Sequence, residues 1–321
     1  MTNAMRPWIL AVSTAALAAP ASAQDGAGSA GAAVLQMLAG GRAAALSGAY
    51  TAAAGDADVL FYNPAGIAGL TAAAAFSYQR HVEDIGLASA AGAFQLGRVV
   101  VGVSALFLDY GDIDELIPDP AFGGQTGMPT GNTVGASEIA ARVAAALPLM
   151  DGRLAVGAAA GLVSVDLAGE SRSAPALDLG ARYAVPFGTV GASIRNIGGS
   201  LSGSGLADAP LPTQLRLGGA FELLGESGLG ATVAADLVAE LEEGGAGVVA
   251  GVEAGLLPSG TSRIGAVGRV GFNGAAGDDG LGTLQLGGGL SLGGFAVDYA
   301  YQNYDFFGSL HRVGIRWSRL P

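Results

Sequence analysis

The 321-residue sequence contains no cysteine and no lysine, so all 15 of its basic residues are arginines. Without cysteine the chain forms no disulfide and has no thiol chemistry, and a zinc site becomes improbable. The formal net charge is −12, which argues against a nucleic-acid partner because phosphate binding needs a basic surface. No motif in the sequence indicates a metal ion or another cofactor.

The chain also has few charged residues, 13% against 50% hydrophobic residues, where about 25% charged is usual. Beyond residue 24, however, no run of about 18 apolar residues offers a membrane-spanning helix. Many of the 55 glycines lie inside segments that alternate apolar and polar residues, a pattern that predicts a transmembrane β-barrel. The alternative is a soluble Gly/Ala-rich β-solenoid, but no fixed-period repeat supports it.

Residues 1–23 have the pattern of a secretory signal peptide. Arg6 provides the positive charge, residues 8–19 the apolar run, and Ala21-Ser22-Ala23 the small residues of a cleavage site. We therefore expect a mature chain that begins at Gln24 on the far side of the inner membrane.

Residues 24–71 are rich in small residues and have only short helical signals, which predicts a leader followed by a plug inside the barrel. The plug motif is Asn63-Pro64-Ala65-Gly66, where the proline biases the preceding asparagine away from helical angles. Phe61 and Tyr62, directly before the motif, are candidates for contact with a ligand.

Residues 72–317 predict an all-β, closed antiparallel barrel of about 14 strands, with a tail at 318–321. Each segment has about the ten residues that a tilted strand needs to cross a bilayer. The expected strands are 73–81, 87–96, 98–109, 136–147, 153–165, 175–185, 189–197, 212–222, 229–238, 246–256, 262–272, 282–291, 294–302 and 309–317.

The last segment illustrates the two faces expected of a barrel wall. Val313 and Ile315 lie on one face and Arg312 and Arg316 on the other, as lipid outside and a filled lumen inside require. The connections alternate between short turns and longer loops, the longest being residues 110–135. This asymmetry is typical of periplasmic turns and external loops.

Charged residues recur on the predicted inner faces, where each needs a partner. We interpret most of them as structural pairs that brace the wall or hold the plug, with Asp298 paired to Arg312 or Arg316; a charged ladder that selects solutes is the alternative. The set is Arg142, Asp178, Arg182, Arg195, Arg216, Asp236, Glu253, Arg263, Arg269, Asp298, Arg312 and Arg316.

One segment formally matches a hydrolase nucleophile elbow, Gly289-Leu290-Ser291-Leu292-Gly293, and Asp298 and His311 follow in hydrolase order. The elbow needs a strand-to-helix turn, whereas this segment is expected at a hairpin. The acidic run at 109–119 lacks the spacing of an EF-hand loop. We therefore expect no enzyme and no metal site.

Several segments in this order resemble the PorV/PorQ proteins, within the wider FadL-like group of outer-membrane barrels, whose plug carries an Asn-Pro-Ala element. A departure is Leu46-Ser47, where such proteins often have Met-Gly. The segments are Gly41-Arg42-Ala43, Gly48-Ala49-Tyr50-Thr51-Ala52, Asp56 to Ile67, Val190 to Gly198, Leu211 to Gly218, Phe295 to Tyr301 and His311-Arg312.

The resemblance implies an outer-membrane protein, surrounded by outer-membrane lipid, that passively transports a small hydrophobic or amphipathic molecule through its lumen. The alternative is a PorV-like component of a type IX secretion pathway, a shuttle or attachment partner for secreted proteins. An apolar pocket that reaches the plug near Phe61 and Asn63, with a lateral gap in the wall, favours the first. A sealed lumen below a wide external cavity favours the second.

Overall fold

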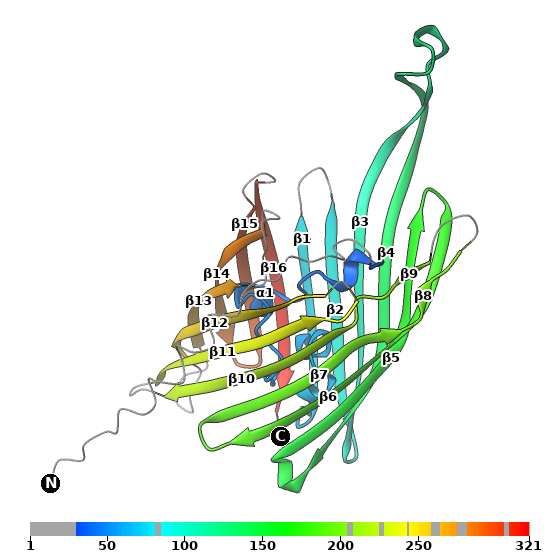
Figure 1. The fold of residues 1–321 in the computed structure, drawn as a ribbon. Coiled ribbons are helices and arrows are strands. Elements are labelled where there is room, and N and C mark those ends of the chain that lie inside the picture. The colour runs from blue at the N-terminus through cyan, green and yellow to red at the C-terminus, as the bar shows by residue number, and fades with distance from the viewer. Residues whose placement is uncertain are drawn as a thin grey trace, which may run out of the picture.

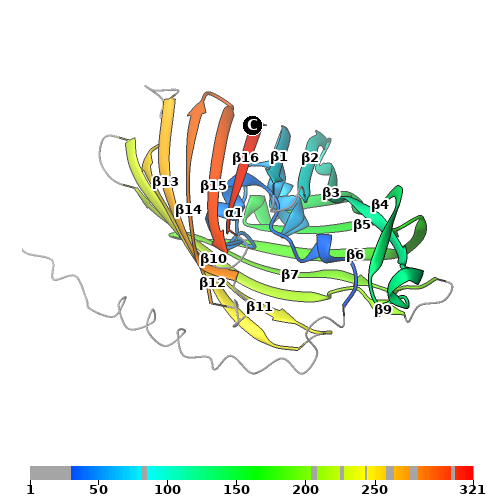
Figure 2. The same ribbon diagram turned by 90° about the horizontal axis from the view of Figure 1, so that it is seen from above.

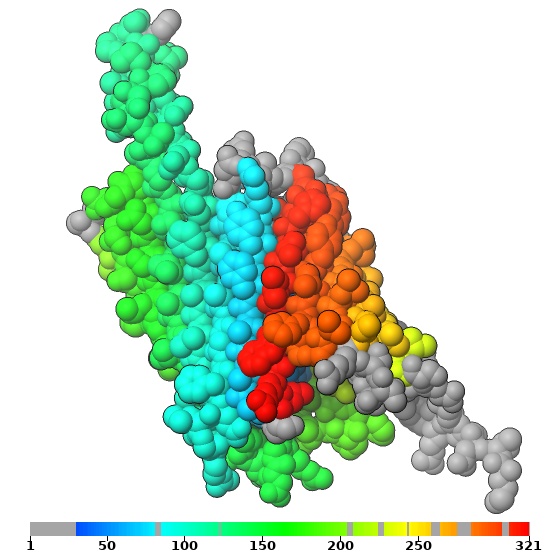
Figure 3. Space-filling view, turned by 180° about the vertical axis from the view of Figure 1, so that it is seen from behind, coloured from blue at the N-terminus to red at the C-terminus, as the bar shows by residue number. Residues whose placement is uncertain are grey.

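Fourteen antiparallel strands close into a barrel, because β1 pairs with β16 from Ala72 opposite Arg319 to Arg80 opposite His311. The computed structural model describes residues 30–80, 85–203, 208–224, 228–242, 244–257, 264–274, 281–304 and 308–320. The predicted signal peptide and Arg263 lie outside the described residues. Figures 1 and 3 show the closure, with β1 in cyan against β16 in red.

The strands, in the order of the chain, are β1 (Ala72–Arg80), β2 (Gly86–Leu96), β3 (Val99–Pro118), β4 (Gly127–Leu149), β5 (Leu154–Leu167), β6 (Glu170–Val185), β7 (Gly188–Gly198), β10 (Gln214–Leu224), β11 (Leu229–Glu240), β12 (Ala246–Leu256), β13 (Ile264–Asn273), β14 (Leu281–Leu292), β15 (Phe295–Tyr304) and β16 (Gly308–Arg319). The prediction of a closed barrel of about fourteen strands is confirmed. Strand β16 ends at Arg319, two residues beyond the predicted boundary.

The alternation of side chains sets the two faces of the wall. In β13, Ile264 and Phe272 are exposed on the outside, whereas Arg269 is buried in the lumen. Strand β3 is apolar on both faces because its inner side chains, such as Leu106 and Leu108, belong to the core that packs on the plug. Outer side chains such as Phe107 are exposed.

The longest connection, predicted as an external loop over residues 110–135, consists mostly of the extended ends of β3 and β4, which form a hairpin. Strands β3 and β4 continue far beyond the other strands (Figure 1), and Ile113 pairs with Val134 and Ile117 with Met128. These cross-strand apolar pairs stabilise the ribbon. We call this end of the barrel the hairpin end and the opposite end, which includes the turn at 293–294 and the end of β16, the short-turn end.

Residues 30–71 lie inside the barrel as a plug (Figure 2, blue). Its short helices are η1 (Ala33–Leu35), α1 (Gly41–Ala45), η2 (Ala57–Phe61) and η3 (Pro64–Ile67). Other small elements are the 3-10 turns η5 (Pro120–Phe122) and η6 (Met150–Gly152) and the two-stranded sheet of β8 (Ser200–Leu201) and β9 (Ala209–Pro210). Among the described helices, none is long and apolar enough to cross a membrane.

The plug contacts the two sides of the lumen in different ways. Toward β1–β6 it forms one apolar cluster with the wall, in which Val59, Leu60 and Ile67 pack against small inner side chains. Toward β7 and β10–β16 the inner wall carries most of the buried charges. Packing of buried apolar side chains therefore holds one side of the plug, and hydrogen bonds and ion pairs hold the other.

Candidate functional site: the plug and its seat in the wall

Asn63 joins the plug motif to the wall. Its side-chain oxygen accepts a hydrogen bond from the Ala65 amide at 3.0 Å and caps η3, with Pro64 in the first turn. Its amide nitrogen donates to the carbonyl oxygens of Thr51 at 2.8 Å and Ala181 at 3.1 Å. Asn63 is fully buried, so one side chain caps the start of η3, fixes a plug turn and binds strand β6.

Glycines form the wall where the plug backbone approaches it. A Cβ atom added at Gly157 would lie 2.6 Å from the Ala65 amide nitrogen, and one added at Gly191 would collide with the Thr51 carbonyl oxygen. Only glycine allows this backbone-to-backbone approach. The inner glycines where an added Cβ would meet plug backbone or side-chain atoms include Gly102, Gly157, Gly180, Gly191, Gly251, Gly271 and Gly287.

At the short-turn end, plug and wall exchange charged partners. Plug Arg42 donates to both oxygens of wall Glu253, at 3.1 and 2.9 Å. Plug Asp56 accepts from wall Arg316 at 3.0 Å and from Arg42 at 3.3 Å. Arg269 links Glu253 to Asp298, which also binds Arg316. We call these six residues, Arg42, Asp56, Glu253, Arg269, Asp298 and Arg316, the Arg42 cluster.

A second polar group holds the plug turn at residues 48–51. One oxygen of wall Asp236 accepts from the Tyr50 and Thr51 amides, both at 3.0 Å, and from the Thr51 hydroxyl at 2.6 Å. Arg216 donates to the same oxygen at 3.1 Å and also to the Gly48 carbonyl. Charge-assisted bonds are the stronger kind, so this turn is tightly fixed.

The other predicted lumen charges lie in separate places around the wall. Arg142 and Asp178 pair at 3.1 Å within the wall. Arg182 donates to the plug carbonyl of Ala52 at 3.0 Å. Arg195 lies over the Tyr62 ring and Arg312 binds Gln79. Asp298 accepts a hydrogen bond from Arg316, one of the two partners expected for it.

The two predicted ligand contacts, Phe61 and Tyr62, are both buried, 3% and 2% exposed. Phe61 belongs to the apolar cluster between plug and wall. The Tyr62 hydroxyl donates to the Ala39 carbonyl at 2.8 Å, and its ring packs against Tyr50 and two arginines. A molecule in the lumen reaches these side chains only if the plug moves, so contact with a ligand remains a prediction.

Burial shifts the pKa values of titratable groups in the plug, among them those of Asp58 and Tyr50. Burial, with a further effect of the Asp56 charge, raises the pKa of the Asp58 carboxyl to about 7, against the opposing influence of Arg316 and Arg312. Oδ1 of Asp58 has no hydrogen-bond partner among the described residues. Burial likewise raises the pKa of the Tyr50 hydroxyl, which donates to Asp56 at 2.6 Å.

The plug residues Arg42 and Asp56 were not identified from the sequence as partners of charged wall residues. Asp56 is a natural candidate to cap a short helix, but it makes no capping bond and instead binds arginines of plug and wall. A signal was present, because Arg42, Asp56 and Asp58 are the only charged residues between 30 and 71. Three charges in an otherwise neutral enclosed segment need partners from the wall.

The residues of the formal hydrolase match do not come together. Ser291 lies within strand β14, Asp298 is buried in the lumen, and His311 lies on the outer face of β16. Among the described residues, no group of three or more His, Asp or Glu side chains is placed to hold a metal ion.

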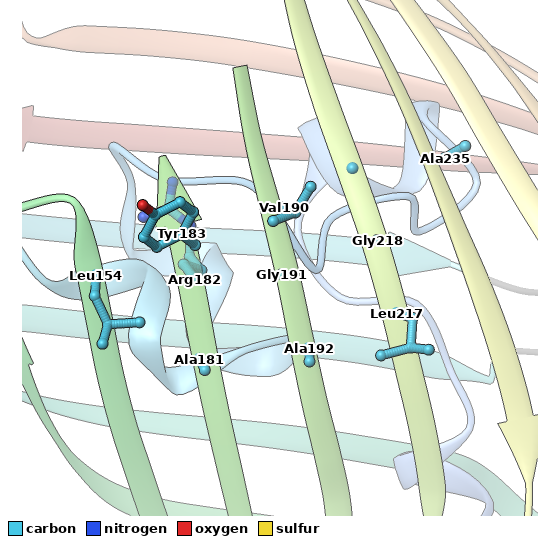
Figure 4. A pocket seen from close by; sticks show the side chains of 11 residues that line it. Leu154, Ala181, Arg182, Tyr183, Val190, Gly191, Ala192, Leu217, Gly218 and Ala235 are labelled. Atoms are coloured by element: carbon cyan, nitrogen blue, oxygen red, sulfur yellow. The ribbon is translucent and has the colours of Figure 1, made fainter. Parts of the chain in front are cut away.

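An apolar hollow of about 510 Å³ lies in the outer wall over the plug turn (Figure 4). Side chains of Leu154, Tyr183, Val190 and Leu217 surround it. Its floor consists of small residues of β6, β7 and β10, namely Ala181, Ala192, Gly191, Gly218 and Gly219. The Asn63 amide binds the Ala181 carbonyl from the inside. We call this depression the β5–β11 hollow.

This architecture is shared with several solved structures. The Ralstonia pickettii toluene transporter TbuX superposes with a TM-score of 0.55 at 16% identity, covering 88% of this chain and 98% of that one. The CymD monoaromatic hydrocarbon channel gives 0.56 at 14%, covering 88% and 97%. A Pseudomonas aeruginosa FadL homologue gives 0.51 at 10%, covering 87% and 98%. The chain has a FadL-like fold.

The similarity covers nearly the whole length of each of these structures, so the fold matches as a unit. No family model and no curated protein matches the sequence. At 10–16% identity the likeness establishes the FadL-like architecture.

Proposed function

We propose that this chain is an outer-membrane channel through which small hydrophobic or amphipathic molecules pass without an energy source, after the plug shifts. The observation that carries the proposal is the β5–β11 hollow, an apolar depression separated from the Thr51–Asn63 region of the plug by one layer of wall backbone. Three structures with the same fold are described as a toluene transporter, a monoaromatic hydrocarbon channel and a FadL homologue, which supports this class of cargo.

Small residues form the floor of the β5–β11 hollow. Ala181 and Ala192 face outward and Gly180 and Gly191 face inward, so the wall is thin at these four positions. The large inward side chain beside them is Arg182, which binds the plug carbonyl of Ala52. An apolar solute gains about 25 cal/mol for each Å² of surface that it removes from water. A path from the lumen into this hollow therefore favours apolar over polar cargo.

Plug movement can be tested by cross-linking, because the chain has no cysteine of its own. A Cβ atom at Gly251 would lie 2.8 Å from the Leu46 Cβ, about 1 Å short of the usual disulfide separation. The double variant Leu46→Cys/Gly251→Cys joins plug to wall when oxidised. We expect oxidation to stop uptake of radiolabelled toluene and reduction to restore it.

Each single-cysteine variant serves as a control for the same treatment, and labelled glucose serves as a polar control solute. Equal uptake of toluene by the oxidised and reduced double variant would contradict plug movement. Uptake of glucose at the rate of toluene would contradict the cargo class.

Attachment of a secreted protein, as in PorV-like proteins, is the second candidate, and the β3–β4 hairpin is the observation in its favour. Ile113, Leu116 and Ile117 are 43–60% exposed there, on a ribbon that extends beyond the barrel. Apolar exposure of this kind often marks a protein interface. Removing residues 113–131 should abolish the binding of a secreted partner and leave toluene uptake unchanged if this role is correct.

A further inference from the structure

A second hollow, of about 600 Å³, lies on the outer face of strands β13–β16, on the other side of the barrel from the plug motif's seat on β5–β7. Gly268 and Gly288 lie directly opposite each other in the ladder and form its floor. Leu290, Val297 and Tyr299 stand around them. We call this depression the β13–β16 hollow.

The two glycines interrupt the large outward side chains of strands β13–β16. Outward positions on these strands are otherwise mostly large and exposed, such as Leu290 at 67% and Val297 at 52%. No atom lies within 4 Å of a Cβ built on Gly268. An open depression among projecting apolar side chains leaves their flanks without dispersion contacts unless another apolar chain fills it.

At its hairpin end the hollow meets a polar rim. Tyr299 lines the hollow, and its hydroxyl lies 2.7 Å from Nδ1 of His311. The other ring nitrogen of His311 lies 3.2 Å from the Ser309 hydroxyl. Arg80 is exposed on the same outer face, directly across the ladder from His311.

The rim has the chemistry of an anion site. The hydroxyl groups of Tyr299 and Ser309 each lie within hydrogen-bond distance of a His311 ring nitrogen, and a hydroxyl group can also donate to a phosphate oxygen. The two hydroxyl groups, the His311 ring and the side chain of Arg80 therefore share one outer face at this end of the strands. Arginine pairs with phosphate oxygens in a bidentate manner.

Taken with the apolar hollow, this geometry points to a bound amphiphile. We propose that the β13–β16 hollow and its rim bind one molecule of lipid A, with an acyl chain over Gly268 and Gly288 and a phosphate at Arg80, Ser309 and Tyr299. The choice of lipid A rests on the proposed outer-membrane location, since loop asymmetry places the hairpin end outside, where the leaflet consists of this glycolipid.

The test uses purified, delipidated full-length protein and measures bound lipid by native mass spectrometry after addition of lipid A or phosphatidylglycerol. We expect one lipid A per chain. Arg80→Ala/Ser309→Ala should weaken its binding at least about tenfold, and so should Gly268→Leu, which fills the hollow. Arg319→Ala, an exposed arginine at the other end of the outer wall, and Gly199→Leu, which has open space around it, should bind like the wild type.

Binding that both test variants retain would overturn the site. Equal binding of phosphatidylglycerol would overturn the choice of lipid A. Because no transport step is measured, either result is independent of the proposed function. Each variant's heat-modifiable mobility in electrophoresis reports whether the barrel has folded, and an unfolded Arg80→Ala/Ser309→Ala variant is replaced by Arg80→Gln, for which the same loss is expected.

Discussion

The Arg42 cluster provides the most direct test of how the plug is held, through the variant Arg42→Ala. Arg42 donates four side-chain hydrogen bonds, two to Glu253 and one each to Tyr50 and Asp56. Its removal leaves Glu253 with Arg269 and Asp56 with Arg316. Breaking a buried ion pair costs about 3–5 kcal/mol when one charge is left alone. Because both carboxylates keep an arginine, we expect the lower end, about 3 kcal/mol.

The assay measures plug opening through a single buried cysteine. Ser47 is 2% exposed and its hydroxyl has no hydrogen-bond partner among the described residues, so Ser47→Cys is nearly isosteric. A maleimide labels this thiol only when the plug opens locally. Since 1.4 kcal/mol corresponds to about a tenfold change, Arg42→Ala should accelerate labelling by about 100-fold.

Matched variants separate this effect from a general loss of charge. Arg98→Ala removes an exposed arginine from the β2–β3 turn and should leave labelling unchanged. The exchange Arg42→Glu/Glu253→Arg should not restore protection, because the new glutamate would face Asp56 and the new arginine would face Arg269. Labelling of the Arg42→Ala protein within about twofold of the parent would refute the idea that this cluster holds the plug.

Two further predictions concern the plug. The raised pKa of Asp58 means that its contribution to stability is complete below the unfolded value near pH 4 and is lost as the pH rises through about 7. In the Ser47→Cys background, Asp58→Asn should therefore slow labelling of the introduced thiol strongly at pH 8 and much less at pH 5, relative to an exposed-cysteine standard. Gly191→Val should push the Thr51 backbone of the plug away from strand β7 and raise ion conductance in planar bilayers, whereas Gly199→Val should not. Equal conductance of the two variants would contradict the idea that the contact at Gly191 holds the plug in place.

The barrel itself could be predicted from local sequence. In a strand, consecutive side chains point to opposite faces, so segments such as the last one, with Val313 and Ile315 opposed to Arg312 and Arg316, record their two environments in their own order. Strand length and turn spacing are equally local, which is why closure by fourteen strands could be foreseen. The hairpin at 110–135 could not, because its stability depends on pairs such as Ile117 with Met128 across a turn.

Only the tertiary structure decided which partners meet in the lumen. Arg42 and Glu253 are 211 residues apart, and Asn63 and Ala181 are 118 apart, so their contact depends on the path of the plug through the closed barrel. The sequence alone predicts that the buried charged residues need partners, but the identity of each partner depends on the tertiary structure. The outer hollows arose in the same way, because Gly268 and Gly288 form a floor only where strand register places them side by side.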